Sequence, residues 1–269
     1  MKKNEKRKPA AIVFGGRSPI ALSCAFSLAE NQHVFLVTRR IDDELESEIR
    51  GNPRVTLVEA DLAREGAAHS AIQSIYDKGF EPTALAFLQR YRPTGEPSFE
   101  EHSRVELWSI AESLEAVASL KSPSTMVNVV LSSSPAAHKV VDDQDLAYHV
   151  VKSGQEALAR FFGAKMRRNG IHVNAVRVGS LVIKSRAQKY WDSIPEVVKG
   201  LEQLSPTGHI LSSAEVGARL AGLLSPALTG LSGQVFTVDG GFSLLDGSQL
   251  ARAALDFQGD DYDSFPLLK

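Results

Sequence analysis

The amino-acid sequence predicts an α/β fold, in which helices cover both faces of a doubly wound parallel sheet. Short apolar runs alternate with longer segments of helical periodicity along most of the 269 residues. This alternation is typical of parallel strands joined by crossover helices. No repeat, low-complexity tract or linker divides the chain, so we expect a single domain.

Each predicted strand is a short apolar run bounded by glycine, proline or polar residues. In chain order, the strands are expected at 11–14, 34–38, 55–58, 84–88, 126–132, 171–177 and 234–238. The segments between them have the spacing of apolar residues that favours helices. These helices are expected at 20–30, 64–78, 99–121, 146–169 and 213–224.

Three segments lie outside this alternation. Residues 1–8 and 243–269 flank the predicted domain, residues 9–242, and residues 184–206 lie within it. Residues 1–8 form a basic tail, and the apolar run after it is too short for a signal peptide. Residues 184–206 contain Trp191 and are predicted either as a lid over a site or as an ordinary helical excursion. Residues 243–269 form an extension that either packs at a subunit interface or frays; the sequence leaves this open.

Composition excludes several classes of function. Thirty basic and 32 acidic residues give a net charge of -2, which disfavours nucleic acid as a partner. No apolar run approaches the roughly 18 residues of a membrane span. The only cysteine, Cys24, cannot form an internal disulfide, and the seven histidines show no metal-binding spacing. We therefore expect a cytoplasmic protein without a metal site.

The first strand is followed at once by a glycine turn that opens a helix, in the run Phe14-Gly-Gly-Arg-Ser-Pro-Ile-Ala-Leu22. Such a turn brings backbone N–H groups and the positive end of a helix dipole to a pyrophosphate. The N–H at Pro19 is lost, and a Gly-Gly turn before a helix is also ordinary architecture. The predicted cofactor contacts here are Gly15, Arg17, Ser18 and Ile20.

Two arginines follow the second predicted strand, about twenty residues downstream, where an acidic residue would bind the ribose hydroxyls of NAD. Arg39 and Arg40 instead offer guanidinium groups, which suit a 2'-phosphate. This favours NADP(H) over NAD(H), unless both arginines are simply solvated.

Tyr148 and Lys152 lie four residues apart in a predicted helix and therefore share one face. A phenol has an ordinary pKa of about 10. A nearby ammonium lowers the pKa of a phenol, so the pair is suited to proton transfer near neutral pH. Ser132, Ser133 and Ser134 end the preceding strand and offer hydroxyls to a substrate carbonyl, or merely form a turn.

Motifs of other chemistries are incomplete or absent. The run Gly230-Leu-Ser-Gly-Gln234 differs from a hydrolase elbow by its final glutamine. The chain has neither a phosphate loop ending in Gly-Lys-Ser/Thr nor a His-Glu-x-x-His motif.

Taken together, residues 9–242 resemble the single-domain members of the short-chain dehydrogenase/reductase family. The resemblance rests on Tyr148-His-Val-Val-Lys-Ser-Gly154 and Gly170-Ile-His-Val-Asn-Ala-Val-Arg-Val-Gly179, together with Glu59-Ala-Asp-Leu62, Ser205-Pro-Thr-Gly208, Ser213-Ala-Glu-Val216 and Gly233-Gln-Val-Phe-Thr-Val-Asp-Gly-Gly241. It implies a Rossmann-type sheet of about seven strands. It also implies a homotetramer or homodimer packed through the helices at 99–121 and 146–169.

The resemblance assigns catalytic roles to three side chains. Tyr148 is the expected general acid/base, and Lys152 lowers its pKa and holds the nicotinamide ribose. Ser133 is the expected partner of the carbonyl, although its spacing from Tyr148 leaves Ser134 as an alternative.

The resemblance also extends the set of cofactor contacts. Asp61 matches the aspartate that contacts adenine in the family. Further expected contacts are Leu62, Gly179 and Leu181, besides Tyr148 and Lys152 themselves.

The chain departs from the family at several points. The glycine pattern T-G-x-x-x-G-I-G lacks its threonine and two glycines, Ala86-Phe-Leu-Gln-Arg-Tyr-Arg92 replaces Asn-Asn-Ala-Gly, and Val178 and Ile183 replace a proline and a threonine. Glu106 stands where the family has an asparagine that supports a relay water. It can accept hydrogen bonds from water or pair with Lys152, and pairing would partly cancel the effect of the ammonium on Tyr148.

The leading hypothesis is an NADP(H)-dependent oxidoreductase that transfers a hydride between nicotinamide and a ketone or secondary alcohol. The alternative is a catalytically weak cofactor-binding protein that acts as a sensor or scaffold. An epimerase or dehydratase is disfavoured because the chain lacks room for an extra substrate domain. Arg90 and Arg92 either favour an anionic substrate or form a solvated basic loop.

Overall fold

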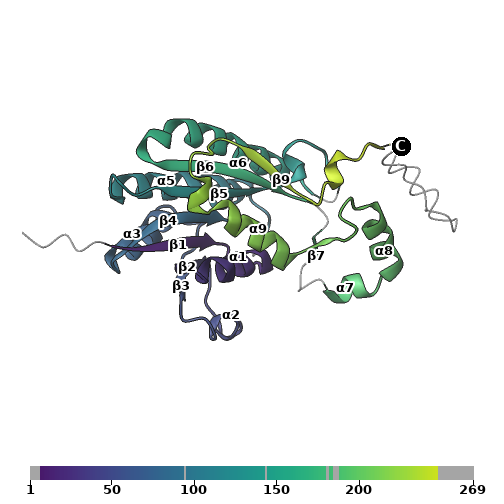
Figure 1. Ribbon diagram of the computed structural model, residues 1–269, viewed down its shortest axis with the longest axis horizontal. Helices are drawn as coiled ribbons and strands as arrows, with labels where there is room; N and C mark the ends of the chain where they lie inside the picture. The colour runs from purple at the N-terminus through teal and green to yellow at the C-terminus, as the bar shows by residue number, and fades with distance from the viewer. Residues whose placement is uncertain (1–6, 94, 143, 180–181, 184–187, 248–269) are drawn as a thin grey trace, which may run out of the picture.

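A seven-stranded parallel sheet forms the centre of the molecule (Figure 1). The computed structural model describes residues 7–93, 95–142, 144–179, 182–183 and 188–247. The strand order is β3-β2-β1-β4-β5-β6-β9. The strands are β1 (Lys8–Phe14), β2 (His33–Thr38), β3 (Val55–Glu59), β4 (Phe80–Phe87), β5 (Val127–Ser133), β6 (Ile171–Val178) and β9 (Val235–Val238). All seven predicted strands are therefore confirmed.

Helices cover both faces of the sheet, as predicted. One face packs against α3 (Ala67–Asp77), α5 (Ser109–Leu120) and α6 (Leu146–Lys165). The other packs against α1 (Pro19–Ala29) and α9 (Ser213–Leu223). Because apolar side chains point to both sides of the strands, each face has its own buried cluster.

The predicted helix 99–121 is not continuous. It begins as α4 (Phe99–Ser103), widens into a π-helical turn (Arg104–Trp108) and continues as α5. Single π turns change the direction in which side chains leave a helix and are frequent at functional sites. This turn carries Glu106, whose side chain is fully buried.

The sequence prediction missed α2 (Asp43–Ile49), β7 (Val182–Ile183) and β8 (Leu211–Ser212). The segment 184–206, for which a helical excursion was one of the two alternatives, contains α7 (Gln188–Asp192) and α8 (Pro195–Leu204). In α2 only Leu45 is buried, so the helix has little apolar periodicity. Its start is fixed by Asp42, whose side chain accepts a hydrogen bond from the Leu45 N–H at 3.1 Å. Figure 1 shows α7 and α8 beyond the carboxyl ends of the strands.

The lid, the domain bounds and the cytoplasmic setting stay predictions. Residues 184–187 of the lid lie outside the described ranges, and none of the described side chains of 188–206 lines the main cavity. Most of the C-terminal extension, 248–269, and most of the basic tail, 1–6, also lie outside them. Among the residues that are described, no helix is long and apolar enough to cross a bilayer.

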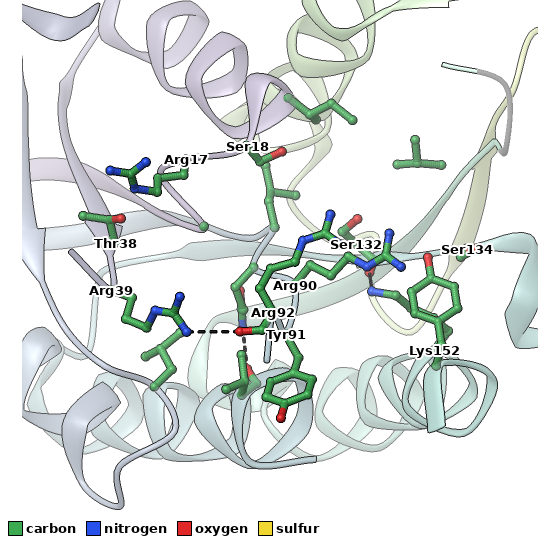
Figure 2. A pocket seen from close by; sticks show the side chains of 18 of the residues that line it. Arg17, Ser18, Thr38, Arg39, Arg90, Tyr91, Arg92, Ser132, Ser134 and Lys152 are labelled. Carbon is green, nitrogen blue, oxygen red and sulfur yellow. Dashed lines mark hydrogen bonds between the residues drawn. The ribbon is translucent and has the colours of Figure 1, made fainter. Parts of the chain in front are cut away.

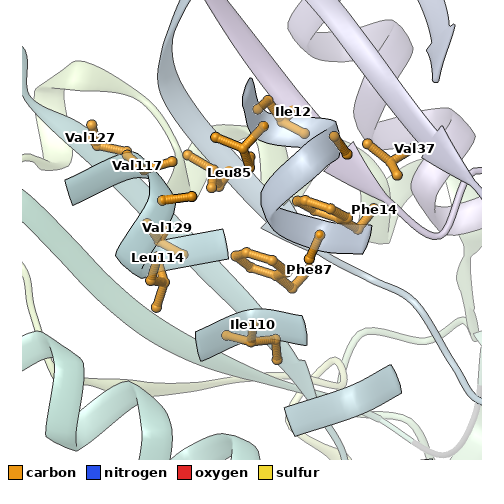
Figure 3. Close-up of a cluster of buried hydrophobic side chains, with 14 of the residues drawn as sticks. Ile12, Phe14, Val37, Leu85, Phe87, Ile110, Leu114, Val117, Val127 and Val129 are labelled. Carbon is orange, nitrogen blue, oxygen red and sulfur yellow. The ribbon is translucent and has the colours of Figure 1, made fainter. Parts of the chain in front are cut away.

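The core beneath the carboxyl edge contains a pair of stacked rings, Phe14 and Phe87 (Figure 3). Their centroids are 4.6 Å apart and the planes differ by 8°. Since these residues end β1 and β4, the stack fixes the two strand ends side by side. Connections leave β1 and β4 toward opposite faces, and in doubly wound sheets ligands bind in the crevice at this point.

Directly after β1 the chain passes very close to the backbone that follows β4. Gly15 has φ +94°, and a Cβ atom there would lie 2.7 Å from the backbone of Leu88. Only glycine adopts this conformation without strain and leaves room for the neighbouring strand end. The glycine turn is therefore required by the fold as well as suited to a ligand.

Candidate active site

A cavity of about 800 Å³ opens along the carboxyl edge of the sheet. Its walls come from the segments after five strands: β1, β2, β3, β4 and β5, with the start of α6 and the end of β6. It brings together the predicted residues Gly15, Arg17, Ser18, Ile20, Arg39, Asp61, Leu62, Ser133, Tyr148, Lys152 and Gly179. Arg40 does not line the cavity, and Leu181 lies outside the described residues.

One end of the cavity is formed by the glycine turn and the first turn of α1. The Ser18 N–H is already bound to the Gly15 carbonyl at 2.8 Å. Pro19 occupies the first helical position and has no N–H, and Ala21 is fully buried, so the donor of this helix end toward the cavity is the N–H of Ile20. This N–H group and the helix dipole leave this end suited to an anion.

Arginine side chains surround the same end. Arg17 forms an ion pair with Asp42, and its other terminal nitrogen lies 4.0 Å from Glu44. Arg39 donates a hydrogen bond to the Arg92 carbonyl at 3.2 Å and extends into the cavity. Figure 2 shows Arg17, Thr38 and Arg39 at one side of the cavity and Lys152 at the other.

Tyr148 and Lys152 form the opposite end, at the start of α6. Asp145 caps this helix by accepting a hydrogen bond from the Tyr148 N–H at 2.7 Å. The Lys152 Nζ lies 5.3 Å from the centroid of the Tyr148 ring. The two side chains therefore meet, and both line the cavity.

Lys152 is buried, with 4% of its surface exposed, and is paired with Glu106. Its Nζ donates to Glu106 Oε2 at 2.8 Å, to the Ser132 carbonyl at 3.1 Å and to Gln155 Oε1 at 3.0 Å. An ammonium has three hydrogens, so each of them has a hydrogen-bond acceptor within the protein. Of the two possibilities for Glu106, the structure adopts the ion pair with Lys152.

Glu106 is itself fully satisfied. Its Oε1 accepts from the Tyr91 N–H at 2.7 Å and lies 3.1 Å from His102 Nε2. Burial alone would raise the pKa of Glu106, but the Lys152 ammonium and these hydrogen bonds lower it to about 2. Glu106 is thus a carboxylate at neutral pH and balances the charge of Lys152.

The three serines after β5 differ in what their hydroxyls bind. Ser133 donates to Glu156 Oε1 at 3.0 Å and lies 3.3 Å from the Lys152 carbonyl. Glu156 also receives two hydrogen bonds from Arg177, at 2.6 and 2.8 Å. Ser134 instead accepts a hydrogen bond from the Ala136 N–H at 3.3 Å. Its own hydrogen has no acceptor among the described residues, so Ser134 remains able to donate to a ligand.

The segment Arg90-Tyr91-Arg92, which follows β4, lines the cavity next to Tyr148. The Arg90 guanidinium carbon lies 4.6 Å from the Tyr148 ring centroid, and its Nη2 donates to Gln144 Oε1 at 2.6 Å. The Tyr91 hydroxyl donates to Glu101 Oε2 at 2.9 Å, which ties this segment to α4.

Sequence reasoning missed two members of the site, His102 and Gln155. His102 lies four residues before Glu106, and Gln155 lies three residues after Lys152. Residues at this spacing share one face of a helix, so the spacing could have indicated both contacts. Within the described part of the chain, no three histidine, cysteine or acidic side chains gather as metal ligands.

The chain is similar to known reductases and dehydrogenases. The model of a protein family described as enoyl-(acyl carrier protein) reductase matches residues 15–243. The enoyl-acyl-carrier-protein reductase (NADH) FabI of Nostoc sp. is 31% identical over 96 residues, 36% of each chain. The 3beta-hydroxysteroid dehydrogenase 1 of Eggerthella lenta is 28% identical over 133 residues, 49% of this chain and 48% of that protein. The aligned parts therefore span less than half of either relative.

Solved structures share the fold. The RhlG/NADP active-site complex of Pseudomonas aeruginosa superimposes with a TM-score of 0.74 at 21% identity, covering 87% of this chain and 96% of that one. A 3-oxoacyl-acyl-carrier-protein reductase from Brucella melitensis, in complex with NAD, gives a TM-score of 0.75 at 21% identity, covering 90% and 100%.

Proposed function

Because the chain belongs to the short-chain dehydrogenase/reductase family, we propose that it is an NADP(H)-dependent oxidoreductase acting on a ketone or secondary alcohol. The observation that carries this proposal is the meeting of Tyr148 and Lys152 at one end of a cavity whose other end is a glycine turn and a helix start. Reduction of carbonyl substrates, followed by the loss of NADPH absorbance, tests it. Oxidation of secondary alcohols with NADP+ tests the reverse direction.

The residues of the cavity fit a dinucleotide. The N–H group of Ile20 at the start of α1 suits the pyrophosphate, and Asp61 and Leu62 line the cavity where the family binds adenine. Gly179 has no room for a side chain, since a Cβ atom would lie 2.6 Å from Asp239. Bound NADPH would supply the hydride that the carbonyl carbon receives.

The proton is the part of the reaction that this chain supplies. In the proposed step, the Tyr148 hydroxyl donates its proton to the carbonyl oxygen as that oxygen gains negative charge. We assign the hydrogen bond to the same oxygen to Ser134, because the Ser133 hydroxyl is bound to Glu156. Lys152 stabilises the resulting phenolate through its charge. To hold a ribose hydroxyl as well, it must exchange one of its three present acceptors.

A cofactor-binding sensor or scaffold is the second candidate. It is favoured by the saturated hydrogen bonds of Lys152 and by Arg90, which lies over the Tyr148 ring. Titration of NADPH and NADP+ by fluorescence, followed by a broad panel of carbonyl compounds, separates the two. Tight binding without hydride transfer to any compound would favour the sensor.

Arg39 is the residue proposed to select NADP(H). It lines the cavity and, within the described residues, has no carboxylate partner. Replacing Arg39 with alanine should raise the Kd for NADPH about tenfold to a hundredfold, because hydrogen bonds to a charged phosphate are lost. The Kd for NADH should change less than about threefold. Arg168→Ala is the control, since Arg168 is exposed near the amino end of β6. Equal losses for both cofactors would contradict a role in selection.

The homo-oligomer implied by the family also stays a proposal. The helices expected to pack between subunits expose large apolar side chains, Trp108 at 60% and Phe161 at 56%. A Trp108→Glu, Phe161→Glu double variant should elute as a monomer in size-exclusion chromatography with light scattering. An unchanged mass would place the contact elsewhere.

A further inference from the structure

Arg90 and Arg92, like Arg39, are cavity cations without a carboxylate partner among the described residues. Lys152 is balanced by Glu106, and Arg17 by Asp42. The Arg90 guanidinium donates a hydrogen bond to the neutral amide of Gln144 at 2.6 Å. Figure 2 shows Arg90 and Arg92 side by side in the middle of the cavity. Two guanidinium groups without an ion-pair partner among the described residues favour the binding of an anionic ligand.

These two arginines are separate from the groups suited to the pyrophosphate. That end already has Arg17, Arg39 and the start of α1. Arg90 lies instead against the Tyr148 ring, 4.6 Å from its centroid. Partial burial and the neighbouring Arg90 lower the pKa of Arg92, so the pair repels itself and an anion would relieve that repulsion. An anion here would sit beside the reacting carbonyl rather than beside the adenosine.

A second hollow, of about 520 Å³, opens on the other side of the same segment. It shares Arg90, Arg92 and Tyr148 with the main cavity. The rest of its wall is mainly apolar and includes Phe99, Leu146, Ala147 and Val150. Phe99 is 54% exposed and Leu146 79%, so apolar surface is open to a ligand. The side chain proposed to donate the proton thus lies between a cationic pair and an apolar hollow.

We propose that the substrate is an oxo acid, a carbonyl compound with a carboxylate a few bonds from the carbonyl and an apolar remainder. Arg90 and Arg92 bind the carboxylate, Tyr148 meets the carbonyl, and the remainder occupies the second hollow. A guanidinium presents two parallel N–H donors, which match the two oxygens of a carboxylate. This inference rests on the proposed function and narrows its substrate class.

Matched pairs of oxo acids and their methyl esters test it by steady-state kinetics with NADPH. The wild type should prefer each acid, and Arg90→Gln should lower kcat/KM for the acid about tenfold to a hundredfold, mainly through KM. The ester should change less than about threefold. Arg90→Lys keeps the charge without the paired donors and should recover part of the loss. Arg168→Gln is the control for removal of an exposed arginine far from the cavity.

Three results would overturn the inference: equal losses for acid and ester, a loss confined to NADPH affinity, or a preference for the corresponding phosphate esters over the acids. Calorimetric titration of the oxo acids into the NADP+-loaded protein separates this inference from the proposed function. Acid binding that depends on Arg90 supports the inference even when no carbonyl is reduced. If the protein reduces neutral ketones but does not bind the oxo acids, the inference is overturned while the proposed function stands.

Discussion

Tyr148→Phe is expected to lower kcat about a thousandfold for every carbonyl substrate that the protein reduces. A positioned general acid typically contributes two to four orders of magnitude, and phenylalanine keeps the ring but has no proton to give. The Kd for NADPH should stay within about twofold, because the ring contacts with Arg90 and Lys152 remain. Stopped-flow absorbance at saturating NADPH measures the chemical step directly.

Tyr76→Phe is the matched control. Tyr76 is buried in α3, outside the cavity, and its hydroxyl has no hydrogen-bond partner in the described part of the chain. Losing that hydroxyl should leave kcat unchanged and should not destabilise the fold, because an unpartnered buried polar group is itself unfavourable. If Tyr148→Phe and the wild type had equal kcat, Tyr148 would not be the proton donor.

Glu106→Gln is expected to lower the free energy of unfolding by about 3 kcal/mol at pH 7. The amide nearly preserves the volume but leaves the Lys152 ammonium without its countercharge at a site with no solvent exposure. Removing one partner of a buried ion pair typically costs 3–5 kcal/mol, and the remaining acceptors on Ser132 and Gln155 place this case at about the lower limit. Urea denaturation followed by circular dichroism measures the change.

The control for this variant is Glu112→Gln, which breaks the partly exposed pair with Arg104 and should lower the free energy of unfolding by less than about 1 kcal/mol.

The pH dependence of stability gives a second test of the Glu106–Lys152 pair. Since the pKa of Glu106 falls from its ordinary value of 4.5 to about 2 on folding, its contribution is complete above pH 4.5 and is lost as the pH falls toward 2. The stability difference between wild type and Glu106→Gln should therefore shrink over that interval. A difference that is constant from pH 5 to pH 2 would contradict the assignment.

The sheet and its main helices followed from sequence because they depend on apolar periodicity. The central strands β1, β2 and β4 have buried residues on both faces, which leaves a continuous apolar run in each. The helix α2 lacks such a pattern, since its formation depends on the Asp42 cap and only Leu45 is buried. Two-residue strands such as β7 and β8 contain too few residues to show any period.

Most of the predicted site residues line one cavity, but the contacts between their side chains were not predictable from the sequence. The predicted helix 99–121 was continuous, and the π-helical turn that carries Glu106 toward Lys152 has no sequence signature of this kind. The choice between Ser133 and Ser134 depends on where β5 ends, because neighbouring side chains point in different directions. The position of Arg90 over Tyr148 depends on a loop whose path is set by tertiary contacts such as that between Tyr91 and Glu101.

The Phe14–Phe87 stack has a consequence for how the cleft adapts to a ligand. The two rings join the ends of β1 and β4, which form the floor of the crevice, so these strand ends move together. The floor therefore does not hinge open, and any adjustment in width falls to the rim. The Arg90–Arg92 loop belongs to that rim, and its side chains are held by hydrogen bonds such as those to Gln144 and Glu101. Adjustment to different ligands is therefore expected in the side chains of the rim rather than in the floor of the cleft.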